Sequence, residues 1–285
     1  MEIKDASLIF AHVWADIESE FGRTNLIFPG EIIWLGGAPG AGKGTNTPFV
    51  MEARGITANP IVISDLLSSP RAQKIKAAGN LVGDEEVIEL LLRKLLESQY
   101  QRGVIVDGFP RTTVQTECLK HFFDKMISLR EEMRQQGLEL PRPLFRTVLL
   151  FVDEEVSIRR QLERGEKAAE QNSKIAESGV GDKEVIRPTD LDPELARNRY
   201  RLFKDTTYDA LSSLRKIFHF HFIDAEKSID EVQEMIEDEF SYQSSLELSG
   251  ETHDRIRTIG TAGQLVLYAR QELVERLETY NEDHP

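Results

Sequence analysis

The chain has 285 residues, enough for one or two domains, and its 40% apolar content suffices for a substantial core. A formal net charge of −14 disfavours nucleic acid or an anionic membrane as the main partner. The start lacks the basic and apolar segments of a signal peptide, and no apolar stretch is long enough for a membrane span. Cys118 is the only cysteine, which excludes an internal disulfide and a cysteine-built zinc site. We therefore expect a cytoplasmic protein.

Amphipathic helices are predicted near both ends of the chain. Residues 5–22 carry Phe10, Trp14, Ile17 and Phe21 at helical spacing, and residues 255–279 carry a second apolar stripe. We expect both helices to pack on the core. Partner binding is the weaker alternative, because apolar helix faces usually serve packing.

Five short apolar runs predict strands, with helical periodicity between them: 32–35, 61–63, 104–106, 148–152 and 218–223. The runs are continuously apolar, as in a parallel sheet that helices cover on both faces. This order predicts a doubly wound α/β domain, in which ligands lie beyond the carboxyl ends of the strands.

The segment GGAPGAGKGT, residues 36–45, follows the first of these strands and should open a helix. Glycines let backbone N–H groups surround a phosphate, and Lys43 would reach the β- and γ-phosphates. The usual phosphate loop has Ser or Thr directly after the lysine, whereas here Gly44 comes first and Thr45 second. A flexible turn is the alternative, but the strand before, the helix after and the lysine in register favour a phosphate loop. Pro48, which costs about 3 kcal/mol inside a helix, predicts a kink or irregularity between Gly44 and Pro48.

A second motif, VIVDGFPRTTVQ at residues 104–115, places Asp107 at the end of a strand. A carboxylate there can hold magnesium through water. Gly108 and Pro110 then form a turn that projects Arg111 toward the same crevice. A common Asp-Gly turn followed by a surface arginine is the alternative interpretation.

Four further arginines extend this picture. Arg160 and Arg164 share a helical face, and Arg187 and Arg199 flank the beginning of another helix. Together with Arg111 they favour one polyanion site, although any of them could instead form a solvated ion pair. Residues 165–186 are polar and are expected to be exposed and mobile.

With these motifs the sequence resembles the adenylate kinase family over most of residues 31–240. In that family a glycine normally follows the lysine and a threonine comes next, so the phosphate loop is intact. The resemblance implies a three-layer P-loop kinase fold with a five-stranded parallel sheet, an acceptor-binding segment at 60–90 and a lid at 165–186. The lid composition favours helix over hairpin. Residues 1–30 and 241–285 would be helical extensions.

The resemblance also implies roles for individual residues. Catalytic roles fall on Lys43, Arg111, Arg164, Arg187 and Arg199. The donor nucleotide would contact Gly37, Gly40, Ala41, Gly42, Lys43, Gly44, Thr45, Arg160, Lys227 and Ile229. The acceptor would contact Ser64, Arg71, Val82, Gly108, Arg111 and Gln115. Asp107 would hold Mg²⁺ through water, with ATP as co-substrate and without zinc.

Two departures from the family pattern concern ligand contacts. Ser68 stands where an acceptor arginine is expected, and Arg71 is the candidate replacement; Thr189 stands where the family often has aspartate. The predicted reaction is MgATP plus AMP giving two ADP, because the Gln115 amide matches the edge of adenine. UMP, CMP or GMP as acceptor, or a non-catalytic nucleotide sensor, are the alternatives. We expect a monomer that binds ATP and AMP.

Overall fold

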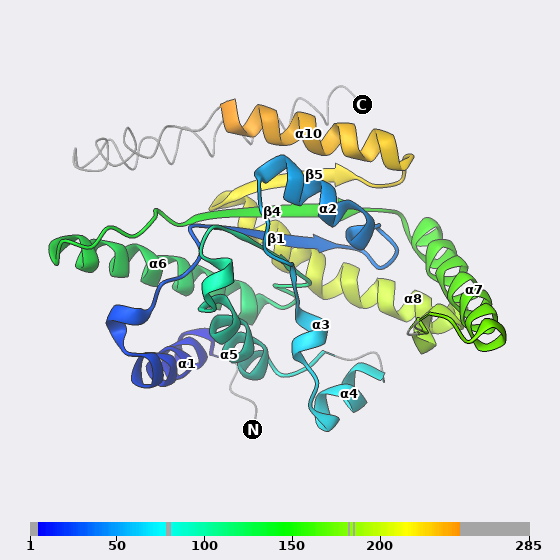
Figure 1. Ribbon diagram of the computed structural model, residues 1–285, viewed down its shortest axis with the longest axis horizontal. Coiled ribbons are helices and arrows are strands. Elements are labelled where there is room, and N and C mark those ends of the chain that lie inside the picture. Colours follow the sequence, from blue (N-terminus) through cyan, green and yellow to red (C-terminus); the bar gives the residue numbers. More distant parts are fainter. Residues whose placement is uncertain (1–4, 78–80, 182, 185, 246–285) are drawn as a thin grey trace.

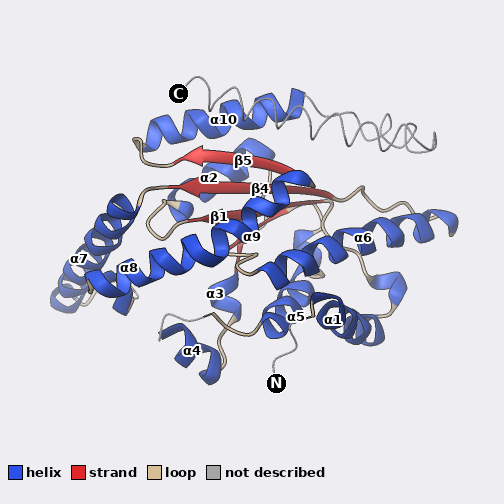
Figure 2. Cartoon of the chain, turned by 180° about the vertical axis from the view of Figure 1, so that it is seen from behind, coloured by secondary structure: helices blue, strands red, loops and turns tan. Residues whose placement is uncertain are grey.

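The computed structural model describes residues 5–77, 81–181, 183–184 and 186–245 (Figure 1). Its centre is a five-stranded sheet in the order β2-β3-β1-β4-β5, with every neighbouring pair parallel. The strands are β1 (Glu31–Gly37), β2 (Ile61–Val62), β3 (Val104–Asp107), β4 (Leu144–Phe151) and β5 (His219–Asp224). Helices cover both faces, which confirms the predicted three-layer fold (Figures 1 and 2).

The helices in the described part of the chain surround this sheet. They are α1 (Ala6–Phe21), α2 (Lys43–Arg54), α3 (Ile63–Leu66), α4 (Pro70–Ala77), α5 (Asp84–Leu95), α6 (Thr113–Gln135), α7 (Glu154–Ser178), α8 (Pro193–Leu202), α9 (Asp209–Ser212) and α10 (Ile229–Ser245). Short helical turns lie at Arg23–Asn25, Ser98–Tyr100, Pro188–Asp190, Phe203–Tyr208 and Ser213–Lys216. The carboxyl ends of the strands point toward the side of the molecule where α7 and α8 lie (Figure 1).

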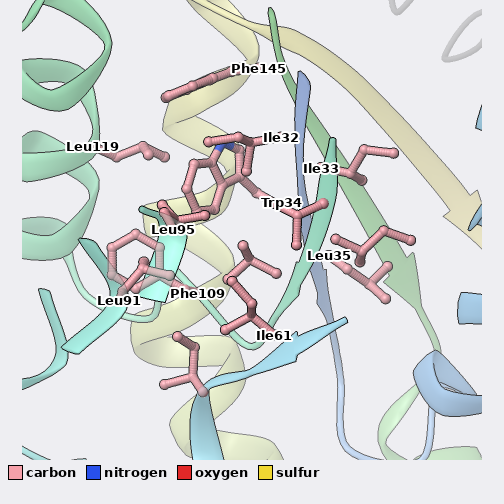
Figure 3. Packing of buried hydrophobic residues seen from close by; sticks show 14 of the residues in the cluster. Ile32, Ile33, Trp34, Leu35, Ile61, Leu91, Leu95, Phe109, Leu119 and Phe145 are labelled. Atoms are coloured by element: carbon pink, nitrogen blue, oxygen red, sulfur yellow. The ribbon is translucent and has the colours of Figure 1, made fainter. Parts of the chain in front are cut away.

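Consecutive residues of β1 are buried on opposite faces of the sheet. Figure 3 shows Ile32 and Trp34 on one side of the strand and Ile33 and Leu35 on the other. The fully buried Trp34 ring packs against Phe109 and Phe145, with centroid distances of 5.6 and 5.2 Å. Burial on both faces explains the continuous apolar run and gives the loop after β1 a rigid base.

The predicted N-terminal helix is confirmed as α1. Its side chains at Ile9, Phe10, Val13, Trp14 and Ile17 are buried in the main core. Polar contacts also tie α1 to two other helices: His12 lies 2.7 Å from Glu85 of α5, and Ser7 lies 3.0 Å from His121 of α6. The stripe predicted at residues 255–279 lies outside the described residues.

Two local expectations can be compared with the helices. The sequence predicted a kink or irregularity between Gly44 and Pro48. The structure instead has a continuous α2 from Lys43 to Arg54, with Pro48 inside it. Side chains support its first turns, because Asn46 and Thr47 donate to the carbonyl oxygens of Gly42 and Lys43.

The prediction of helix rather than hairpin is confirmed for residues 165–178, which continue α7. No helix in the described ranges is long and apolar enough to cross a membrane.

Candidate active site

The loop between β1 and α2 is shaped by glycines at its closest backbone contacts. Gly37, Gly40 and Gly42 have φ values of 155°, 77° and 77°, which other residues rarely adopt. A Cβ atom would lie 2.7 Å from the Leu150 carbonyl oxygen at Gly37, and 2.9 Å from the Ser157 carbonyl oxygen at Gly40. The helix begins at Lys43, so its free N–H groups and positive dipole end face the loop. This is the geometry of an anion-binding cradle.

Lys43 folds back across this cradle. Its ammonium group donates to the carbonyl oxygen of Gly37 at 3.0 Å and lies 3.5 Å from that of Ala38. Burial lowers the pKa of Lys43 to about 8, with further lowering by nearby arginines, while Asp107 opposes the shift. The arginines that act on it are Arg111, Arg199 and Arg187. The structure therefore brings the predicted cations together around the loop.

The two residues after Lys43 leave space beside the loop. Gly44 and Thr45 are exposed, and a Cβ atom on Gly44 would meet no described heavy atom within 4 Å. Ala41, in contrast, is buried. The residue that follows the lysine is thus a glycine at a place where a side chain would project into open space.

Asp107 and Arg111 lie at the end of β3, next to the end of β1. Asp107 pairs in register with Leu35, two residues before the last residue of β1. The Arg111 guanidinium donates to the Gly108 carbonyl oxygen at 2.7 Å, and burial, with some help from Arg187, lowers its pKa. Gly108 has φ 87°, and a Cβ atom there would collide with that guanidinium. Arg111 is therefore only partly exposed, and its side chain is held against the turn that follows β3.

Arg164 and Arg199 share one buried counterion, Asp190. Arg164 donates to both Asp190 oxygens at 2.9 and 2.6 Å, and Arg199 lies 3.7 Å from the same carboxylate. Burial and the charges of Arg187 and Arg164 lower the pKa of Arg199 to about 10. Asp190 is only 3% exposed, whereas the Arg164 side chain is 44% exposed, so the pair joins a buried carboxylate to a partly solvated guanidinium. Its carboxylate orients the two guanidinium groups.

Thr189 takes part in the same cluster. Its hydroxyl accepts a hydrogen bond from Arg199 at 3.3 Å and lies 3.5 Å from Asp190. The hydroxyl thus remains a polar contact at a position where the family often has aspartate. Arg187, two residues before Thr189, is exposed.

Arg160 joins α7 to the loop before α10. Its guanidinium donates to the carbonyl oxygens of Ala225 at 2.7 Å and Glu226 at 3.1 Å. Lys227 and Ile229, both exposed, follow in the same loop and at the start of α10. The residues expected around the donor base therefore meet at one place, next to Gly40 of the glycine loop.

The residues expected around the acceptor are spread over several elements. Ser64 lies in α3 and donates to Asp65 at 3.1 Å, and Val82 is buried. Arg71 lies in α4, and its side chain is outside the described part. Gln115 is only 2% exposed; its amide oxygen accepts from the Arg111 N–H at 2.8 Å, and its amide nitrogen donates to Asp84 at 2.9 Å. The sequence did not single out Asp84 as a functional residue. The one feature that could have indicated it is its place as an acidic residue at the start of a helix.

Two comparisons with known proteins agree with this geometry. Residues 36–177, from the glycine loop into α7, match a family described as "AAA domain". An adenylate kinase of Flavobacterium psychrophilum is 28% identical over 207 residues, which cover 70% of this chain and 93% of that protein. With the five-stranded parallel sheet and the glycine loop at its carboxyl edge, these matches show that the chain has a P-loop kinase fold and is similar to an adenylate kinase.

Proposed function

We propose that the protein is an adenylate kinase, which transfers the γ-phosphoryl group of MgATP to AMP and yields two ADP. The observation that carries this proposal is the convergence of four cations: Lys43, Arg111, Arg187 and Arg199. In addition to burial, the three arginines lower the pKa of Lys43, and Arg187 and Arg111 also lower the pKa of Arg199. Their mutual repulsion favours a highly charged anionic ligand among them. Phosphoryl transfer needs this kind of positioning and charge neutralisation, and little covalent chemistry from the protein.

The donor side would use the glycine loop and Arg160. Backbone N–H groups at Gly40, Gly42 and Gly44 would bind the phosphates, and Lys43 would neutralise the transferring group. Arg160 already holds the loop that contains Lys227, and the donor base would lie against that loop.

Magnesium fits the residues at this site. The open space beside Gly44 leaves room for an ion held largely by phosphate oxygens and water, and Asp107 at the end of β3 supplies a carboxylate for those waters. When bound, the ion would neutralise charge on the phosphates. No cluster of three metal-ligating side chains occurs among the described residues, which is compatible with so few protein ligands.

On the acceptor side, Arg111 would bind the AMP phosphate, with Arg71 in place of the arginine that Ser68 replaces. The internal bonds of Gln115 leave one amide N–H and one oxygen lone pair for the base, which match the edge of adenine. Arg164, Arg187 and Arg199 would neutralise the transferring group. Residues 165–186 would act as the lid that excludes water.

The proposal is tested by measuring ADP formation from MgATP with AMP, UMP, CMP, GMP or no acceptor. We expect AMP-dependent turnover, and loss of at least about 10²-fold in Lys43→Ala with the fold retained. Preference for another monophosphate would show that the acceptor was misassigned. No turnover with any acceptor, together with retained ATP binding, would contradict an enzymatic role and favour a nucleotide sensor.

A further inference from the structure

Asp84, the first residue of α5, accepts two hydrogen bonds from the start of α6. Its Oδ1 atom receives the Thr112 hydroxyl at 2.8 Å and the Gln115 amide nitrogen at 2.9 Å. Thr112 is the N-cap of α6, and its Oγ1 also accepts from the Gln115 backbone N–H at 3.1 Å. One carboxylate oxygen therefore fixes both polar side chains at the beginning of the helix.

Gln115 passes this constraint on to the loop that carries Arg111. The Gln115 amide oxygen accepts from the Arg111 backbone N–H at 2.8 Å. A carboxylate can only accept and a backbone N–H can only donate, so the amide has one orientation that satisfies both. The Arg111 side chain then returns to the Gly108 carbonyl oxygen. These contacts form an uninterrupted chain from Asp84 through Gln115 to Arg111.

We propose that Asp84 is a positioning residue for the acceptor nucleotide. It holds the Gln115 amide in the orientation that presents its remaining N–H, and through that amide it holds the backbone of Arg111. The inference rests on the proposed function, since Arg111 and Gln115 are the residues assigned there to the acceptor phosphate and base.

The donor side provides an internal reference. The glycine loop packs on β4 and the first turns of α7, and Arg160 binds the loop before α10. The Asp84 carboxylate instead bonds Thr112 and Gln115 at the start of α6, on the side proposed for the acceptor. Loss of the Asp84 carboxylate should therefore raise the KM for AMP and leave the KM for ATP unchanged.

Glu85 is the matched control. It also lies in the first turn of α5, but its carboxylate faces α1, where it meets His12 at 2.7 Å. Glu85→Ala removes the same charge from the same helix end without touching Thr112 or Gln115. We expect its KM for AMP to equal that of the wild-type protein.

The test is a kinetic comparison of wild type, Asp84→Ala, Asp84→Asn, Glu85→Ala, Gln115→Ala and the double variant Asp84→Ala/Gln115→Ala. A hydrogen bond to a charged group predicts that Asp84→Ala raises the KM for AMP about 10- to 100-fold. Asp84→Asn keeps an oxygen that can accept both bonds, so it should restore most of this loss. If Asp84 acts through Gln115, the double variant should resemble Gln115→Ala alone.

Additive effects in the double variant, an equal rise in both KM values, or the same loss in Glu85→Ala would overturn the inference. If Asp84→Ala does not fold, Asp84→Leu, which also removes both acceptor bonds but keeps the side-chain volume, replaces it in the cycle with Gln115→Ala, and non-additive KM values are again expected. Failure of the proposed function would be seen in the wild type, as absence of AMP-dependent turnover. Failure of this inference would be seen as an active wild type whose KM for AMP is unchanged in Asp84→Ala.

Discussion

Gly165 of α7 and Asp190 of the following turn are in direct backbone contact. A Cβ atom on Gly165 would lie 2.8 Å from the Asp190 carbonyl carbon and closer still to its oxygen. This approach places the Asp190 carboxylate under Arg164, the residue before the glycine. The arginine cluster thus depends on a glycine whose role is packing.

Gly165→Ala should therefore destabilise the protein. The Asp190 backbone would have to move, and overpacking of this kind costs about 1–3 kcal/mol. Gly44→Ala is the control, because a Cβ atom there meets no described heavy atom and alanine favours the helix. Urea unfolding should show a lower free energy of unfolding for Gly165→Ala only. Equal stability of the two variants would contradict the contact.

Binding of MgATP should weaken with rising pH because of Lys43. Its pKa in the ligand-free protein is about 8, below the ordinary value of 10.5, because it is buried among arginines. Above pH 8 the amine loses its proton, and a bound phosphate must recover it. The Kd measured by calorimetry should therefore rise between pH 7 and pH 9.5, by up to about tenfold for each pH unit above the pKa.

The stability of the ligand-free protein should change in the opposite sense. Between its folded-state pKa of about 8 and its ordinary pKa of 10.5, Lys43 binds more protons in the unfolded chain than in the folded one. This group therefore makes the free energy of unfolding rise with pH.

Lys43→Arg is the control for the pH dependence of MgATP binding, since guanidinium keeps its charge and should give a flatter Kd profile. A wild-type Kd that is equal at pH 7 and pH 9.5 would show that Lys43 does not meet the phosphates.

Arg160→Ala should impair the donor side alone. Loss of the hydrogen bonds to Ala225 and Glu226 releases the loop that leads into α10. We expect the KM for ATP to rise about tenfold or more, with the KM for AMP unchanged. Arg159→Ala is the control, because Arg159 is exposed and lies 3.9 Å from the likewise exposed Glu163. Equal KM values for ATP in the two variants would remove Arg160 from the donor site.

Ile17→Ala should reveal that α1 is part of the folding unit. Ile17 is fully buried in the main core, and a truncation of this kind costs about 2–5 kcal/mol. Leu8→Ala, on the exposed side of the same helix, should change the free energy of unfolding by less than about 0.5 kcal/mol. A separate unfolding step for α1, with the remaining transition unchanged, would contradict this assignment.

The sequence predicted the elements that local patterns determine. Continuous apolar runs identified all five strands, and the glycine loop was correctly expected between the first of them and a helix. Three features depend on approaches between distant segments and could not be read locally: the Asp84–Gln115 bond, the Arg164–Asp190 pair and the contact at Gly165. Residue spacing within a segment carries no information about such approaches. The continuity of α2 through Pro48 was missed because the side chains of Asn46 and Thr47 support its first turns.

The most direct test of the central claim follows the γ-phosphoryl group itself. The wild-type protein is incubated with Mg²⁺, AMP and ATP labelled at the γ-phosphate, and the labelled products are separated before appreciable reverse reaction. Transfer to AMP predicts that the label appears in ADP, with little in inorganic phosphate, and that Lys43→Ala leaves it in ATP. Label that appears in inorganic phosphate, or that stays in ATP with the wild-type protein, would contradict the proposed function.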